Sequence, residues 1–204
     1  MPTTPPITPP IHGIVLAKND KAKALGIKTG MTLKDAYGLC PELVTVEADF
    51  GYYLFYSKRV REIYYKFTDM IEPFGIDEAW LDVTGSARLG SGKEIADKIR
   101  EEVRTVGLTA SVGVSFNKIF AKLGSDLKKP DATTVISYEN FKDVVWKLDC
   151  ADLLMVGKKT AQKLRKYNIQ TIGDIANANV DLLTKQLGVW GKYLYDFAWG
   201  KDET

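Results

Sequence analysis

Apolar residues recur at spacings of three and four along residues 53–67, and this is the clearest hydrophobic pattern in the chain. Positions three and four apart share one helix face, so the pattern predicts a long amphipathic helix. Asp49 precedes this helix and is expected to be its N-cap. The stripe is predicted to lie in the core and consists of Tyr53, Tyr56, Val60, Ile63, Tyr64 and Phe67.

Start and stop residues predict three shorter helices. Their N-caps are expected to be Asn19, Thr32 and Ser91, and the first two helices are expected to end at Gly26 and before Pro41. The third helix begins with a capping box, and its apolar face consists of Ile95, Ile99 and Val103. A further helix is predicted within residues 115–130 and is ended by Pro130.

Short apolar runs between these helices predict strands at residues 13–17, 43–47, 70–74 and 108–114. A central strand is predicted directly after the one at residues 70–74. From about Tyr138 the strands give way to short helices, which indicates a separate helical unit. The order helix, strand, strand, helix, strand is typical of a split β-α-β sheet whose first strand is missing. The fold class is therefore predicted to be α+β, with a ferredoxin-like sheet and a helical unit.

Composition adds limits to this fold. The 204 residues carry a net charge of only +2, so an argument for nucleic acid must come from local clusters of charge. Cys40 and Cys150 fit no metal-ligand spacing and are interpreted as reduced thiols of a cytoplasmic protein. No apolar run approaches the ~20 residues of a membrane span. Residues 1–11 are rich in proline and are predicted to form a disordered tail.

Two adjacent carboxylates, Asp77 and Glu78, stand in the otherwise apolar run 71–85. Desolvation of a carboxylate costs on the order of several kcal/mol unless a cation, hydrogen bonds or a proton compensates. Oxygen ligands of this kind suit Mg²⁺, which is usually held by one or two carboxylates and substrate phosphates. The alternative is that both acids lie at a solvated strand edge and bind nothing. Because successive strand residues face opposite ways, a shared metal site requires a strand start or a distortion, which Gly75 permits.

Lysines gather in two places that bear on this pair. The segment 18–28 is basic, and the helix in residues 115–130 carries Lys118 and Lys122 on one face. Lys128 and Lys129 are expected in its last turn, where cations also favour the helix dipole. These lysines are either solvated helix faces or phosphate ligands beside a carboxylate site.

The stretch 153–169 resembles a helix-hairpin-helix. Its hairpin, Val156 to Lys159, would aim backbone amides at a phosphate, and Gly157 would allow close approach. Five basic residues fall within nine positions without an intervening acid: Lys158, Lys159, Lys163, Arg165 and Lys166. The pattern favours nonspecific binding to the DNA backbone, and the alternative is an ordinary helical turn. Backbone contacts position DNA without reading its sequence.

Together these stretches resemble a Y-family DNA polymerase of the DinB and UmuC type, over roughly residues 12 to 200. The motifs are Gly13-Ile-Val-Leu-Ala-Lys-Asn19, Gly75-Ile-Asp-Glu-Ala-Trp-Leu-Asp-Val-Thr84, Gly113-Val-Ser-Phe-Asn-Lys-Ile-Phe-Ala-Lys122 and Ser125-Asp-Leu-Lys-Lys-Pro130. The resemblance implies fingers at residues 12–49, a palm at 50–136 and a thumb at 137–204. It also implies lesion bypass in DNA repair by template-directed nucleotidyl transfer.

By this resemblance, Asp77 and Glu78 would be catalytic and would bind two Mg²⁺ ions with a dNTP. Lys129 and Lys23 would contact the triphosphate. Residues Val156, Gly157, Lys158, Lys159 and Thr160 would hold primer-template DNA. A sliding clamp would be a further partner, through parts of the family that follow this chain.

The chain departs from the family in ways that change the expectation. A first strand with another metal-binding aspartate is replaced by the proline tail, Asp20 stands at a usual tyrosine, and the family's last DNA-gripping domain is missing. We therefore expect a truncated fragment with weak or no activity, and either a strand-exchanged homo-oligomer or an open sheet edge with disorder near Asp77. The alternative is a non-catalytic module that binds the DNA backbone.

Overall fold

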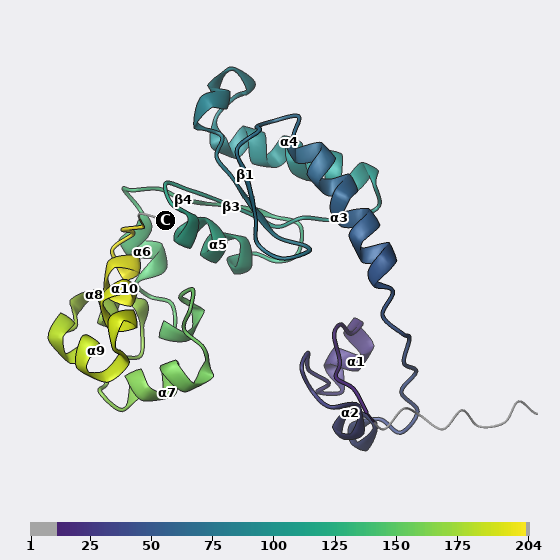
Figure 1. Ribbon diagram of the computed structural model, residues 1–204, viewed down its shortest axis with the longest axis horizontal. Helices are drawn as coiled ribbons and strands as arrows, with labels where there is room; N and C mark the ends of the chain where they lie inside the picture. The colour runs from purple at the N-terminus through teal and green to yellow at the C-terminus, as the bar shows by residue number, and fades with distance from the viewer. Residues whose placement is uncertain (1–11, 203–204) are drawn as a thin grey trace, which may run out of the picture. The chain divides into compact units, whose positions relative to one another are not determined.

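The computed structural model describes residues 12–202 (Figure 1). The chain divides into two compact units, residues 1–53 and residues 54–204, and each is described by itself. The proline-rich segment 1–11, for which disorder is predicted, lies outside the described residues.

The first unit contains two short helices, α1 (Asp20–Ala24) and α2 (Leu33–Leu39). Both predicted N-caps are confirmed, because the side chains of Asn19 and Thr32 accept hydrogen bonds from backbone amides of their helices. The buried residues of the unit are Val15, Ile27 and Ala36.

Both strands predicted in the first unit are wrong. Residues 13–17 contribute only one bridge, between Ile14 and Thr32, and residues 43–47 form no strand. The side chains of Val44 and Val46 are 85% and 90% exposed. Their alternating pattern fits a strand, but within residues 12–202 no neighbouring segment pairs with them.

The long helix α3 (Phe50–Tyr64) is confirmed, with Asp49 as its N-cap. Only its C-terminal half reaches a core. Ile63 and the following Phe67 pack against the apolar face of α4 (Gly92–Thr105), whose capping box is also confirmed. Tyr53 is 45% exposed, so the prediction that the whole aromatic stripe is buried is wrong for the first turns.

The strands of the second unit form two separate pairs. β1 (Ile71–Pro73) runs antiparallel to β2 (Ala79–Leu81), and β3 (Val112–Ser115) runs parallel to β4 (Thr133–Ile136). A 3-10 segment, η1 (Thr84–Leu89), follows β2. Within residues 12–202 no strand connects β2 to β3. The α+β class is confirmed. The strands form two separate pairs, β1–β2 and β3–β4, on the two sides of the position expected for the missing first strand.

Disorder near Asp77 is not what the structure shows, because residues 71–81 form an ordered hairpin. Strand exchange between copies stays a prediction. β4 is an additional strand that the apolar pattern did not identify, and β3 is shorter than the predicted 108–114 segment.

Helix α5 (Lys118–Leu127) connects β3 to β4 and lies directly on β3. An added Cβ at Gly113 would lie 1.8 Å from the backbone oxygen of Ala121, and one at Gly124 would lie 3.2 Å from the Cα of Gly113. The close approach therefore requires glycine at Gly113. The helix ends at Leu127, so Lys128 and Lys129 lie beyond its last turn and not in it as expected.

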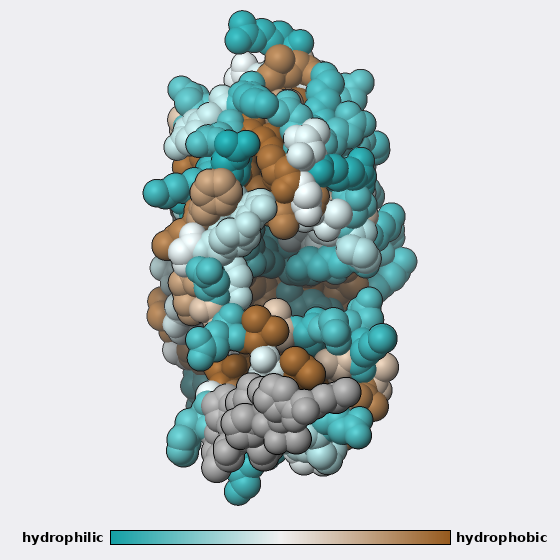
Figure 2. Space-filling view, turned by 90° about the vertical axis from the view of Figure 1, so that its right-hand side faces the viewer, coloured by the Kyte–Doolittle hydropathy of each residue, from teal (hydrophilic) through white to brown (hydrophobic). Residues whose placement is uncertain are grey.

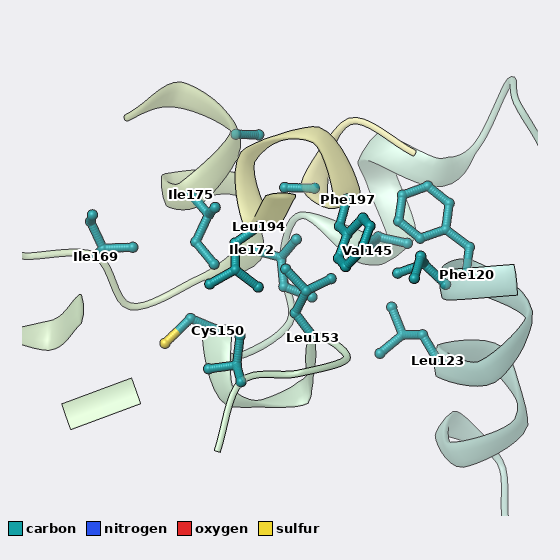
Figure 3. Close-up of a cluster of buried hydrophobic side chains, with 14 of the residues drawn as sticks. Phe120, Leu123, Val145, Cys150, Leu153, Ile169, Ile172, Ile175, Leu194 and Phe197 are labelled. Carbon is teal, nitrogen blue, oxygen red and sulfur yellow. The ribbon is translucent and has the colours of Figure 1, made fainter. Parts of the chain in front are cut away.

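The helical region follows β4. It consists of α6 (Phe141–Val145), η2 (Cys150–Asp152), α7 (Lys158–Arg165), α8 (Ile172–Asn177), α9 (Val180–Leu187) and α10 (Val189–Ala198). Its core includes the inner face of α5: Figure 3 shows Phe120 and Leu123 beside Val145 and Phe197. The helical region and α5 therefore share one hydrophobic core.

The surface carries hydrophobic side chains between hydrophilic ones, as one face shows in Figure 2. Exposed large hydrophobic residues include Val44, Val46, Phe50, Met70, Tyr138 and Val189. Within residues 12–202, no helix has the length and apolar character needed to cross a membrane.

A charged network connects α4 to β4 and to the loop that follows α5. Asp97 accepts hydrogen bonds from Lys93, Arg100 and Thr133, while Arg100 and Arg104 pair with Asp131 at 3.1 and 2.8 Å. The bonds from Lys93 and Thr133 lower the pKa of Asp97 to about 2. The network thus holds the loop from which Lys129 projects.

Substituting Gly113→Ala is expected to lower the free energy of unfolding by about 3 kcal/mol, because the added methyl group would overlap the α5 backbone. Gly85→Ala is the matched control, since a Cβ there would meet no atom within 4 Å. Urea unfolding followed by circular dichroism measures both. Equal stability of the two variants would show that α5 has room to move.

Substituting Asp97→Asn is expected to destabilise the protein at pH 6, by about 1 kcal/mol or less because the carboxylate is partly exposed. The folded pKa is lowered, so this carboxylate stabilises the fold above pH 4 and loses its effect between about pH 4 and pH 2. Urea unfolding at pH 6, 4 and 3 should show the gap to wild type closing. The exposed Glu101→Gln on the same helix is the control, and a gap that stays constant with pH would contradict the assignment.

Candidate active site

The turn between β1 and β2 carries the two predicted catalytic carboxylates. Asp77 lies in the turn and Glu78 immediately precedes β2, so the pair sits at the start of a strand, as a shared site requires. Gly75 has a φ of +87°, a conformation that glycine adopts without strain. The amide of Phe74 donates to the carbonyl of Glu78 at 2.9 Å and closes the turn.

Helix α3 holds this turn from one side. The hydroxyl of Ser57 donates a hydrogen bond to the carbonyl of Ile76, and Arg61 donates to the carbonyl of Gly75 at 3.0 Å. Burial raises the pKa of Tyr64, the positive charge of Arg61 opposes this, and the negative charge of Asp77 adds to it. Helix α3 therefore holds the turn through the backbone carbonyls of Gly75 and Ile76.

Helix α5 holds the other side through its lysines. Lys122 lies 3.1 Å from Glu78, and Lys118 lies 2.6 Å from Glu72 of β1. The indole of Trp80 donates to the carbonyl of Lys118 at 3.0 Å, which fixes β2 on the first turn of α5. The two lysines thus share one helix face, as predicted, and that face meets the hairpin.

The charges around Glu78 alternate in sign. Lys122 also pairs with Asp126 at 2.8 Å, and Asp126 pairs with Lys129 at 2.6 Å. Burial alone would lower the pKa of Lys122, but its hydrogen bonds to Asp126 and Glu78 outweigh this and raise it. Burial would raise the pKa of Asp126, and the two lysines lower it. Lys122 and Asp126 are therefore held in their charged forms.

The two carboxylates have different surroundings. Asp77 is exposed, whereas the side chain of Glu78 is 35% exposed and faces Lys122. Among residues 12–202 no group of three or more His, Cys, Asp or Glu side chains is placed to hold a metal ion. The oxygen donors of Asp77 and Glu78 nevertheless suit Mg²⁺, which needs only one or two protein carboxylates when phosphates complete its shell.

Sequence reasoning identified the carboxylates and the lysine face but missed the partners that hold them. Ser57, Arg61 and Asp126 were not singled out. The spacing of four between Lys122 and Asp126 was an available indication of their ion pair. The contacts of Ser57 and Arg61 join segments far apart in the chain and have no local pattern.

The predicted nucleotide-binding residues lie in different units. Lys129 lies beyond α5 and pairs with Asp126, which also contacts Lys122. Lys23 is exposed on α1, in the first unit, and Asp20 stands in the first turn of the same helix, where an acid favours the helix dipole.

The predicted DNA-binding hairpin lies at the N-terminus of α7. Val156 is buried, Thr160 is half-buried, and Gly157, Lys158 and Lys159 are exposed. Gly157 is the N-cap and supplies no capping side chain, and a Cβ there would meet no atom within 4 Å. The element before the hairpin is the short η2 segment.

Two of the five basic residues near the hairpin are already engaged. Arg165 pairs with Asp149 at 2.7 Å, and Lys163 donates to the carbonyl of Gln186. The other three members, Lys158, Lys159 and Lys166, are exposed, and the first two lie at the start of α7, where backbone amides have no partner within the helix.

Family comparisons cover most of the chain. Residues 4–126 match the impB/mucB/samB family, and residues 151–202 match the family described as DNA polymerase-iota, thumb domain. DNA polymerase IV of Acetivibrio thermocellus is 52% identical over 193 residues, which are 94% of this chain and 48% of that protein. DNA polymerase IV of Moorella thermoacetica is 41% identical over 194 residues, with the same coverage. The chain thus spans about half the length of these curated relatives.

Solved structures give the same similarity. DinB from Sulfolobus solfataricus has a TM-score of 0.82 and 33% identity, covering 91% of this chain and 56% of that one. An insertion ternary complex of Dbh DNA polymerase also has a TM-score of 0.82 and 33% identity, covering 91% of this chain and 55% of that one.

Proposed function

The chain belongs to the impB/mucB/samB family of Y-family DNA polymerases, of the DNA polymerase IV (DinB) type, and we propose that it carries the catalytic carboxylates and DNA-backbone hairpin of template-directed nucleotidyl transfer. One observation carries the proposal. Asp77 and Glu78 lie together in the β1–β2 turn, and the lysine face of α5 is placed against it.

We assign the parts of the chain as the family resemblance implies. Residues 12–49 are the fingers, residues 50–136 the palm and residues 137–204 the thumb. The lesion-bypass role in DNA repair and a cytoplasmic location belong to the same proposal. The free thiols of Cys40 and Cys150 agree with a reducing compartment.

The chain's own residues would act at fixed places. Asp77 and Glu78 would hold two Mg²⁺ ions, and Lys129 and Lys23 would balance the negative charge of the triphosphate. Bound Mg²⁺ stabilises the attacking and leaving oxygens of phosphoryl transfer. Ser57 and Arg61 would keep the turn in place by holding its carbonyl groups.

The partners are primer-template DNA and a dNTP. Support comes from the similar structures described as ternary complexes of Dbh. At the hairpin, the amides of α7 and the ammonium groups of Lys158 and Lys159 would bind backbone phosphates.

A second function is favoured because, among residues 12–202, no group of three or more His, Cys, Asp or Glu side chains is placed to hold a metal ion. The chain would then bind the DNA backbone through α7 without catalysis. The two functions differ in the role of Asp77. Catalysis requires Asp77 for Mg²⁺-dependent dNTP binding, whereas binding of the DNA backbone alone does not require it.

Asp77→Asn is expected to weaken Mg²⁺-dependent dNTP binding by at least about tenfold, because it removes a charged metal ligand. Equilibrium dialysis with labelled dNTP measures the binding, and Glu72→Gln is the control on the same hairpin. Templated primer extension by this chain is expected to be weak and to vanish in Asp77→Asn. Wild type that binds no dNTP with Mg²⁺ would contradict the polymerase proposal and leave the backbone-binding one.

Replacing Lys158 and Lys159 by alanine is expected to weaken DNA binding equally for all sequences. It should also reduce the slope of log K against log salt by about 2, because each lysine neutralises one phosphate. Fluorescence polarisation over a range of salt concentrations measures both effects. The exposed pair Lys147 and Lys185, replaced together, is the control. An equal loss in the control would show that the hairpin is not the contact surface.

A further inference from the structure

Lys122 faces two carboxylates at once, and this arrangement has a consequence for the proposed metal site. Its ammonium lies 3.1 Å from Glu78 and 2.8 Å from Asp126. The Lys122 side chain is only 19% exposed. A charge that is partly removed from water is stabilised by a partner, since losing that partner leaves a partly desolvated charge unpaired.

Glu78 has the converse requirement. Its side chain is 35% exposed, so its charge is partly desolvated, and in the structure Lys122 balances it. A divalent cation bound between Asp77 and Glu78 would place a second positive charge beside that ammonium. Lys122 and the cation therefore compete for the same carboxylate.

Asp126 resolves this competition. It lies one helical turn after Lys122 and contacts it with one carboxylate oxygen, while its other oxygen contacts Lys129 at 2.6 Å. When Glu78 turns to a metal ion, Asp126 still pairs with Lys122. Without Asp126, the release of Glu78 would leave the ammonium without a carboxylate.

We propose that Lys122 is the built-in counter-cation of the metal site: it neutralises Glu78 in the metal-free protein, and when a divalent cation takes Glu78 it stays paired with Asp126. Lys122 and Asp126 are positioning residues in this scheme, because neither needs to touch the metal. The inference rests on the proposed function in one respect, the binding of a divalent cation by Asp77 and Glu78.

The scheme predicts effects of opposite sign on metal affinity. Lys122→Met removes the competitor and should tighten binding by about twofold to fivefold, the size of an ion pair at a partly exposed site. Asp126→Asn removes the alternative partner, so Lys122 stays on Glu78 and binding should weaken by a similar factor. Lys122→Arg keeps the charge and should bind the cation with nearly the affinity of wild type.

A double variant separates transfer of Lys122 from simple repulsion through space. If Asp126 acts by receiving Lys122, then Asp126→Asn has no effect once Lys122 is methionine, and the double variant should bind as tightly as Lys122→Met alone. If the two charges act independently, their effects add and the double variant should return close to wild type.

Mn²⁺ is the probe, and its free fraction is measured by electron paramagnetic resonance at constant ionic strength, with the 204-residue chain and no DNA or nucleotide. Lys118→Met is the matched control, because it removes the other ion pair between α5 and the hairpin, that with Glu72, without touching a metal carboxylate. It should lower the melting temperature and leave Mn²⁺ affinity unchanged. Circular dichroism of each variant checks that it is folded, and Lys122→Gln replaces Lys122→Met if the latter is not.

The possible outcomes are distinct. Tighter binding in Lys122→Met, weaker binding in Asp126→Asn and non-additivity support the inference. Mn²⁺ binding that depends on Asp77 but is unchanged or weakened by Lys122→Met overturns the inference alone, as does additivity in the double variant. Wild type that binds no Mn²⁺, or binding that Asp77→Asn leaves intact, overturns the proposed metal site and the inference with it.

Discussion

The contact between the backbones of β3 and α5 at Gly113 is the constraint on which the second unit depends. No side chain separates the strand from the helix there, since even a Cβ would overlap the oxygen of Ala121. The position of α5 is therefore set by its backbone against β3. Every group that α5 carries takes its place from that contact.

Helix α5 uses each of its faces for a different purpose. Phe120 and Leu123 lie in the core that it shares with the helical region (Figure 3). Lys118 and Lys122 face the β1–β2 hairpin instead. Ion pairs at partly exposed sites contribute about 1 kcal/mol or less, while burying a Phe or Leu side chain contributes about 1.5–3 kcal/mol. The core thus places the helix, and the charges then adjust the hairpin on its surface.

Sequence alone identified the features that depend on neighbouring residues. The caps at Asn19, Thr32, Asp49 and Ser91 could be predicted because a capping side chain bonds an amide two or three residues later. The strand at residues 43–47 could not be judged in this way, since a strand exists only where a partner segment pairs with it. Helix α5 ended earlier than expected, in agreement with the restriction that Pro130 places on the residue before it.

The candidate site divides in the same manner. The adjacent acids, Asp77 and Glu78, are visible in the sequence and carry the family resemblance. The charge network around Glu78 depends on how the hairpin meets α5, which is a matter of tertiary structure. Sequence reasoning treated both acids as groups in an apolar run that need a cation, and the structure meets their needs differently: Asp77 is solvated and Glu78 is paired with Lys122. Burial by itself therefore no longer argues for a metal ion here. The argument for a metal ion is that two adjacent carboxylates lie in a fixed turn of a polymerase-family chain. Lys122, which pairs with Glu78, also has Asp126 as a second carboxylate partner.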